Sequence, residues 1–225
     1  MPDLIIKPKN QSGNKLILQD QSGSAVLTTA DSGATYANAT LTTPTIANMA
    51  NCTFPAGHII QTGYVEDGVR RTTATRYSSG NWEEITGAFK VEITPTSATN
   101  YILCQGSCNA GQSESTYGIA FRWYVTGGGT DGYVGDGTNA NGSQKVANSG
   151  GPTSSGTHTS YQYCPQARFR LNDSTPNWTS GVLTIRLHWA VGGAGTGYWN
   201  ESGNAGSDSN YVNSLSSFVV HEIQG

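Results

Sequence analysis

Apolar and polar residues alternate through much of the chain from Gly57 onward. In Leu183–Trp189 the apolar residues alternate with polar ones, and Phe218 and Val220 alternate in the same way further on. A period of two is typical of a β-strand with one buried face. On this pattern we expect strands at 58–64, 70–77, 89–94, 101–108, 118–125, 162–171, 182–191 and 217–223.

About eight strands with glycine-rich connections predict an all-β fold, an antiparallel β-sandwich of jelly-roll-like type, over residues 57–225. Three connections are long: 126–137, 147–160 and 192–209 are dominated by Gly, Ser, Thr and Asn. Loops of this length in a compact domain are usually functional or disordered. We therefore expect a binding surface on these loops, at the ends of the sandwich.

A decapeptide repeat precedes the predicted sandwich. Its units read QSGNKLILQD, QSGSAVLTTA and DSGATYANAT, and in each a Ser-Gly turn precedes a short strand-like run, at 16–19, 26–29 and 36–39. Such a unit is too small to bury its own apolar face, so partners must come from neighbouring repeats or chains. The residues that need these partners, and that we expect to form anchor or trimer contacts, are Leu16, Leu18, Val26 and Tyr36.

We interpret residues 1–43 as a repeat-built stem that docks to a larger particle, and 44–56 as a connector with a short helix at 45–52. The expected assembly is a homotrimer, since stems built of stacked short strands commonly use three chains. The alternative is that the repeats are three hairpin strands of an ordinary domain.

Composition excludes several classes of function. Only 12% of the residues are charged, the net charge is −3 and the pI is about 5.7, which argue against a nucleic-acid-binding protein. No segment approaches the roughly 18 apolar residues of a membrane span. The apolar run Leu4–Ile6 is too short for the core of a secretory signal. We expect no nucleic-acid partner, no membrane insertion, and synthesis in a cytoplasm without export.

The chain has four cysteines: Cys52, Cys104, Cys108 and Cys164. Four cysteines allow three disulfide pairings, and the sequence does not choose among them. Cys104 and Cys108 fall on one face of one strand about 13 Å apart, too far for a disulfide. We expect buried free thiols that act as small hydrophobic residues.

Catalytic chemistry has little support in the sequence. Glu83 and Glu84 are adjacent, so on a strand they face opposite ways. Asp131 and Asp136 could form the carboxylate pair of a glycan-degrading hydrolase, but Asp and Gly are also ordinary turn residues. We expect no catalytic residue, no metal site and no cofactor.

Aromatic side chains are the better candidates for binding. Flat rings beside amides and hydroxyls suit sugars or protein surfaces. The alternative is that these rings cover the edge of the core or pack at a subunit interface, and Trp82, Trp123 and Trp189 are expected in the core. The candidate receptor-binding residues, in or beside the polar loops, are Tyr133, Trp178, Tyr198, Trp199 and Tyr211.

Three segments carry a resemblance to a known family: PAGHIIQT at 55–62, ITPTS at 93–97 followed by YIL at 101–103, and FVVHEI at 218–223. Together they resemble the C-terminal β-domain of virion structural proteins of tailed bacteriophages of the marine and cyanobacterial type, such as tail fibres and appendages. The resemblance covers most of the chain. It implies a homotrimeric β-structure on a virion.

The expected function is that of a non-enzymatic structural protein, a trimeric fibre or appendage at the virion surface, assembled in the host cytoplasm. Its N-terminal part would dock to a tail, neck or major capsid protein, and its β-domain would face outward for adhesion to host-surface glycans. The alternative is a capsid decoration or cement protein that stabilises the head shell. A tailspike-type glycan hydrolase is the third candidate.

The repeat predicts where the subunits of a trimer touch. Because the apolar residues of the repeat need partners, cross-links between subunits should map to residues 12–40. Chemical cross-linking with peptide mass spectrometry measures this, with light scattering for the mass of the assembly. A trimer whose contacts exclude residues 12–40 contradicts the stem interpretation.

Overall fold

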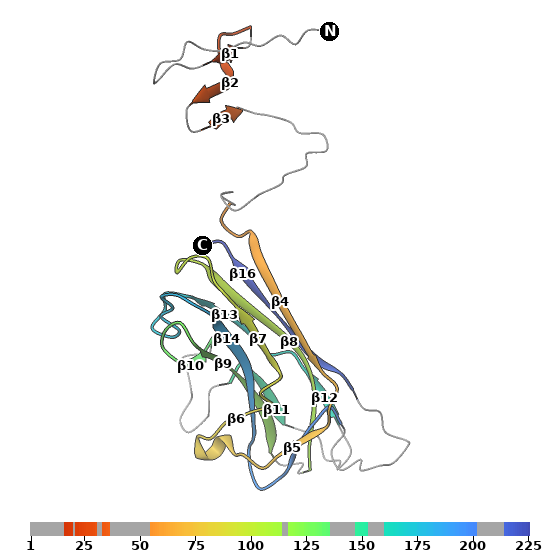
Figure 1. Cartoon of the computed structure of the whole chain (residues 1–225). Coiled ribbons are helices and arrows are strands. Elements are labelled where there is room, and N and C mark those ends of the chain that lie inside the picture. The colour runs from red at the N-terminus through yellow and green to blue at the C-terminus, as the bar shows by residue number, and fades with distance from the viewer. Residues whose placement is uncertain are drawn as a thin grey trace. The chain divides into compact units, whose positions relative to one another are not determined.

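The computed structural model describes residues 16–19, 21–30, 33–36, 55–113, 117–135, 147–152, 160–201 and 214–225. The chain divides into two compact units, Met1–Cys52 and Thr53–Gly225 (Figure 1). The division falls within the segment that the sequence predicts as a connector. The short helix expected at 45–52 lies outside the described residues.

The first unit contains a small antiparallel sheet in the order β1-β2-β3. Its strands are β1 (Ile17–Gln19), β2 (Ala25–Ala30) and β3 (Gly33–Tyr36), so the third begins earlier than the predicted run at 36–39. Gly23, in the turn before β2, has φ +85°, a conformation that glycine adopts without strain. Leu18 is 49% exposed in the single chain, and its expected contact with a partner stays a prediction.

The second unit is an antiparallel β-sandwich, as the alternation predicts. The described residues contain no α-helix and only one short 3-10 turn, Tyr77–Ser79. The strands are β4 (Ile59–Asp67), β5 (Arg71–Thr73), β6 (Glu83–Glu84), β7 (Lys90–Ile93), β8 (Tyr101–Gln112), β9 (Gly118–Thr126), β10 (Gly132–Val134), β11 (Ser149–Pro152), β12 (Ser160–Tyr163), β13 (Gln166–Arg170), β14 (Leu183–Val191), β15 (Gly197–Trp199) and β16 (Ser216–Ile223).

Two sheets make up the sandwich (Figure 1). Sheet I has the order β10-β9-β14-β6, with β11 also paired to β9 and β7 to β14. Sheet II has the order β4-β16-β8-β15-β5, with β12 and β13 both paired to β8. Strand β8 is long enough to pair with β13 and β16 along its first part and with β12 and β15 along its second.

Each strand predicted from the alternation is present, with shifted ends. The predicted strand at 162–171 is interrupted at Cys164 and Pro165, so that it forms β12 and β13. Of 70–77 only β5 is a strand, and a 3-10 turn follows. The short strands β6, β10, β11 and β15 were not predicted, because two to four residues are too few to show a period of two.

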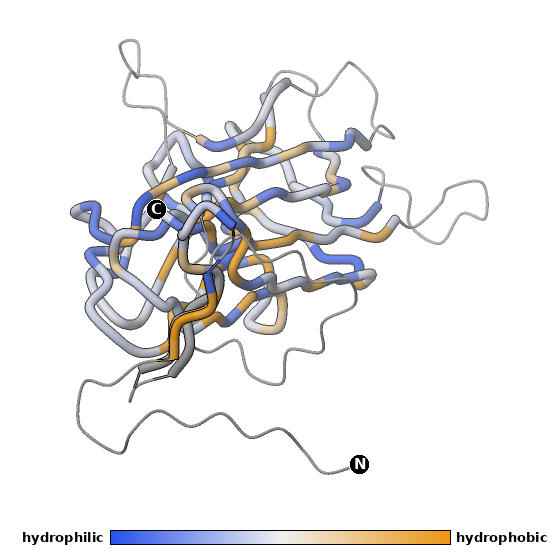
Figure 2. The backbone as a smooth tube through the Cα atoms, turned by 90° about the horizontal axis from the view of Figure 1, so that it is seen from above, coloured by the Kyte–Doolittle hydropathy of each residue, from blue (hydrophilic) through white to orange (hydrophobic). Residues whose placement is uncertain are grey.

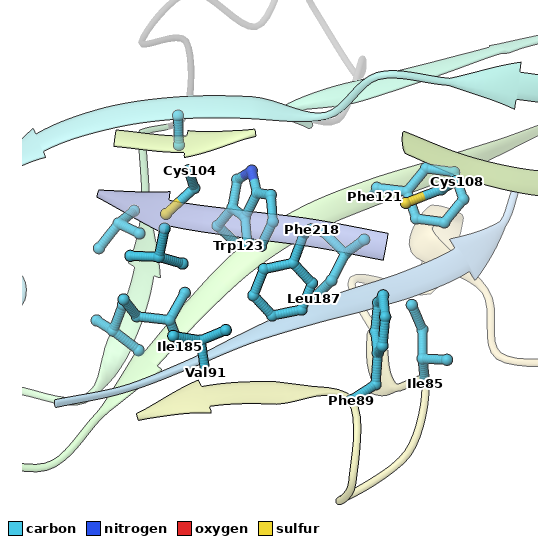
Figure 3. Close-up of a cluster of buried hydrophobic side chains, with 14 of the residues drawn as sticks. Ile85, Phe89, Val91, Cys104, Cys108, Phe121, Trp123, Ile185, Leu187 and Phe218 are labelled. Carbon is cyan, nitrogen blue, oxygen red and sulfur yellow. The ribbon is translucent and has the colours of Figure 1, made fainter. Parts of the chain in front are cut away.

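The alternation places one face of each main strand in the core. Along β16 buried and partly exposed residues alternate without interruption, and the tube in Figure 2 changes between orange and blue along such strands. The ring of Phe218 lies 4.9 Å from that of Phe89 and 5.0 Å from that of Trp123, both edge to face. Figure 3 shows Phe218 beside Trp123 and Leu187 in this cluster. These rings join the two sheets.

Gly63 marks a close approach of the sheets. A Cβ atom at this position of β4 would lie 2.3 Å from a methyl carbon of Val91, which belongs to β7 in sheet I. Real Cβ atoms do not come so near to another carbon, and the neighbour here is a stiff β-branched side chain. Glycine is therefore required at this position for β7 to pack against β4.

A buried carboxylate ties β16 to the turn after β7. Glu222 is fully buried, and it accepts hydrogen bonds from the amides of Gln61 and Asn100 and from both the backbone N–H and the hydroxyl of Thr96. We call these four residues the Glu222 clasp. Gln61 belongs to the PAGHIIQT segment, Thr96 to ITPTS and Glu222 to FVVHEI, so all three segments that carry the family resemblance meet here. A carboxylate with four donors is satisfied without a cation.

The cysteines only partly follow the expectation. Cys104 and Cys108 are free and buried on the inner face of β8, and burial raises the pKa of both thiols. The expectation is wrong for Cys164, which is free but exposed, because it lies in the break between β12 and β13. Cys52 lies outside the described residues.

Because Glu222 is the acceptor of the clasp, we expect Glu222→Gln to destabilise the folded protein. The substitution keeps the shape but replaces an acceptor oxygen with an N–H₂ group that faces other donors, so at least one buried donor loses its partner. We expect the free energy of unfolding to fall by about 1–3 kcal/mol in urea denaturation. Glu92→Gln, the same change at an exposed carboxylate paired with Lys90, is the control and should change little. Equal midpoints for the two variants contradict the role of the clasp.

Candidate functional site

The outer face of sheet I, the side turned away from sheet II, gathers aromatic and cationic side chains. The register pairs Tyr124 of β9 with Tyr133 of β10 on one side, and Arg122 of β9 with His188 of β14 on the other. Trp82 comes from the segment before β6. We call this cluster the aromatic–arginine face; its members are Trp82, Arg122, Tyr124, Tyr133 and His188, and each is partly exposed.

The rings of this face lie close together around one guanidinium. The central carbon of Arg122 is 3.9 Å from the ring centre of Tyr133 and 5.4 Å from that of Trp82. Both distances are within the range of a cation–π interaction. The Tyr124 ring stacks on His188 at 4.7 Å and meets Tyr133 edge to face at 4.9 Å. These contacts fix the rings relative to one another before any ligand binds.

Charged side chains border the cluster on β6, β7 and β14. The Arg186 guanidinium lies 2.9 Å from a Glu84 carboxylate oxygen and donates a hydrogen bond to the Thr126 hydroxyl. Lys90 pairs with Glu92 one strand further along. The aromatic–arginine face is thus continuous with a row of ion pairs across sheet I.

His188 is the titrating group of the face. Burial, together with the smaller effect of the positive charges of Arg186 and Arg122, lowers its pKa from 6.5 to about 4. The imidazole is therefore neutral at pH 7, and its Nδ1 lies 3.2 Å from the Tyr133 hydroxyl.

This arrangement has the chemistry of a binding surface. Partly exposed rings of Trp and Tyr supply flat apolar area to the ring faces of a sugar, and their polar tips supply hydrogen bonds. A guanidinium supplies planar donors for an oxygen-rich ligand. Because these groups come from the neighbouring strands β10, β9 and β14, the surface fits a ligand that lies across the strands, such as a chain.

The structure separates the five aromatic residues predicted for receptor binding. Tyr133 belongs to the aromatic–arginine face, whereas Tyr198 of β15 is partly exposed on sheet II. Trp199 is fully buried in the core, where its indole N–H donates to an Asp67 carboxylate oxygen. Trp178 is only 9% exposed. Tyr211 lies outside the described residues. Among the described residues, Tyr133 is the one member of this set that lies on the aromatic–arginine face.

Trp178 closes the connection that follows β9. Its indole N–H donates to the Gly181 carbonyl, and Gly128 packs against the indole ring. The backbone N–H of Thr130 donates to the Pro176 carbonyl, and that of Thr179 donates to the Gly128 carbonyl. These bonds join the connection after β9 to the connection before β14. In its described part, 126–135, the glycine-rich segment predicted as a binding loop is thus packed against neighbouring backbone.

The other residues considered for chemistry have structural contacts. Glu83 accepts a hydrogen bond from the Thr75 hydroxyl, and Asp131 accepts one from the Gly127 N–H within its turn. Asp136, the partner proposed for Asp131, lies outside the described residues. Within the described ranges no group of three or more His, Cys, Asp or Glu residues could hold a metal ion. In that same part of the chain no helix is long and apolar enough to span a membrane.

Sequence reasoning missed four residues of the face: Trp82, Arg122, Tyr124 and His188. Trp82 was expected in the core, but it is partly exposed. The signal that could have found them is the phase of the alternation. In the β9 sequence FRWYV, Arg122 and Tyr124 alternate with buried residues and so occupy the outward positions.

No family model matches the sequence, and no curated protein matches it. Among solved structures, the chain is similar to a chain of infectious bursal disease virus, Gt strain, with 13% identity and a TM-score of 0.38 over 81% of this chain and 43% of that chain. A Gx strain structure of the same virus matches with 12% identity and a TM-score of 0.32, over 81% and 42% of the two chains. The chain thus spans less than half of those chains. With TM-scores this low, neither likeness carries an argument about function.

The lowered pKa of His188 predicts a loss of stability in acid. The folded state holds the imidazole neutral down to about pH 4, whereas the unfolded chain protonates it near pH 6.5. The contribution of His188 to the free energy of unfolding therefore has its full value above pH 6.5. It is lost as the pH falls from 6.5 towards 4. Thermal unfolding of wild type and His188→Gln at pH 7.5 and pH 4.5 measures the effect. The wild type should lose more stability between the two pH values, and equal losses contradict the assignment.

Proposed function

We propose that this chain is a non-enzymatic structural protein of a tailed-phage virion whose β-sandwich adheres to glycans on the host surface. The observation that carries the proposal is the aromatic–arginine face. Its rings are preorganised around Arg122 by contacts of 3.9 to 5.4 Å and remain partly exposed. Preorganised flat rings bind sugars with little loss of conformational entropy, which suits weak, repeated attachment.

The family resemblance supports the setting on a virion. The three segments that carry it, at 55–62, 93–97 and 218–223, meet in the Glu222 clasp, so they belong to one structural element of the sandwich. The proposal assigns the repeat-built first unit to docking on a tail, neck or capsid protein. Three chains per trimer and many trimers per particle would multiply weak glycan contacts into firm attachment.

A binding assay with matched variants tests the proposal. Purified protein is applied to an array of bacterial lipopolysaccharides and capsular polysaccharides. Tyr133→Ala removes a ring and the support it gives to Arg122, and we expect affinity for any bound polysaccharide to fall about 5- to 10-fold. Tyr64→Ala removes a tyrosine that is 60% exposed on sheet II, and affinity should not change.

Circular dichroism of both variants verifies that they are folded. Equal affinities for wild type and Tyr133→Ala would overturn the proposal, as would an array without any bound member.

A further inference from the structure

We infer that the outer face of sheet II carries a second binding site, which takes a phosphate monoester group. The site consists of Arg168 and Arg170 of β13 and Tyr101 of β8, and we call it the double-arginine patch. It goes beyond the proposed function, because it lies on the other side of the sandwich and shares no residue with the aromatic–arginine face.

The two arginines of the patch are held against one ring. Buried and exposed residues alternate along β13, so Arg168 and Arg170 point outward from sheet II while Phe169 between them is buried. The register places Tyr101 directly opposite Arg170. The central guanidinium carbon lies 4.1 Å from the Tyr101 ring centre in Arg168 and 4.7 Å in Arg170. Both distances are within cation–π range, so one ring holds two like charges near each other.

No carboxylate of the described chain neutralises these charges by contact, since neither guanidinium of the patch forms an ion pair there. Asp173, in the turn after β13, accepts a hydrogen bond from the backbone N–H of Arg170. Glu66 lies on the outer side of β4, with β16 and β8 between it and β13. In sheet I, by contrast, Lys90 and Arg186 each lie against a glutamate.

The side chains of the patch keep donors for a ligand. Both arginines are exposed, and Tyr101 is partly exposed. A guanidinium has five N–H donors in a planar fork, and in these two arginines no side-chain hydrogen bond to the described residues uses them. The patch therefore offers two fixed forks and a charge of +2 within a small area.

This combination matches a phosphate monoester better than other common anions. A carboxylate is planar, carries one charge and is satisfied by one guanidinium. A phosphodiester, such as that of a nucleic acid, also carries one charge. A phosphate monoester has a charge of about −1.5 to −2 at pH 7 and three acceptor oxygens, so both forks can bind it at once. Such a ligand also removes the repulsion between the two arginines.

Matched small probes test the ligand class. The probes are methyl phosphate beside dimethyl phosphate, glucose 6-phosphate beside glucose, and inorganic phosphate, each titrated by NMR into the full chain at pH 7.5 and low salt. We expect methyl phosphate and glucose 6-phosphate to bind about tenfold or more tightly than their partners, and the difference should shrink as salt is raised. If glucose 6-phosphate binds more tightly than inorganic phosphate, the ligand is a phosphorylated sugar; any other order identifies free phosphate.

Variants locate the binding on sheet II. Arg168→Gln and Arg170→Gln should each weaken the binding of glucose 6-phosphate about tenfold. Arg186→Gln is the control, because it removes the same charge from sheet I, where Arg186 is paired with Glu84. Its affinity for glucose 6-phosphate should stay within about twofold of the wild type, since distant exposed charges are screened.

A measurement on the wild type keeps the test valid if a variant does not fold. Methyl phosphate should shift the side-chain Nε–H signals of Arg168 and Arg170 and leave that of Arg186 in place. Shifts of all three signals to the same extent, or of none, would show that phosphate does not bind at the patch.

Equal affinities for methyl and dimethyl phosphate, no binding of any phosphate monoester, or equal losses in Arg168→Gln and Arg186→Gln overturn the inference. Its failure is distinguishable from failure of the proposed function. If Tyr133→Ala leaves polysaccharide binding intact while the patch binds monoesters, the adhesion face fails and the phosphate site stands. If Tyr133→Ala weakens polysaccharide binding and no monoester binds, the reverse holds.

Discussion

The edge-to-face contacts of Phe218 with Phe89 and Trp123 fix the position of one sheet relative to the other. Which residues lie on the outer surfaces depends on this packing. Phe218 comes from β16 in sheet II, whereas Trp123 comes from β9 in sheet I. With Trp123 fixed inward, the strand period of two turns Arg122 and Tyr124 outward. The packing that buries Trp123 in the core therefore also places the aromatic–arginine face on the outer side of sheet I.

The sequence predicts the sandwich well because its main strands are long and amphipathic. Strand β16 alternates through its full length, and its prediction differs from the structure only at its first residue. The face could not be predicted in the same way. Whether Arg122 meets His188 depends on which strands pair and in which register, and both are set by contacts between distant segments. The composition of a single strand determines neither which strands pair nor their register.

The polar residues around Trp178 and Trp199 led to a wrong prediction that these two side chains bind a receptor. Trp178 and Trp199 lie beside Gly, Ser and Asn residues, which suggests an exposed loop, yet both indoles are buried. Glycines next to a large ring let the backbone approach it closely, as Gly128 does at Trp178. Each indole N–H then finds an acceptor nearby, the Gly181 carbonyl or the Asp67 carboxylate. In such a segment, glycine allows an aromatic ring to be enclosed.

The pairing of β4 with β16 also affects how the protein folds. Gln61 and Glu222, which meet in the clasp, are 161 positions apart in the sequence. Strand β4 has β16 as its hydrogen-bonded neighbour in sheet II, so it waits unpaired until nearly all of the intervening chain has been synthesised. Pairings at such separation make folding slow and leave apolar strands exposed to other chains in the interval. During synthesis in a crowded cell, β4 is therefore the strand most in need of protection from aggregation.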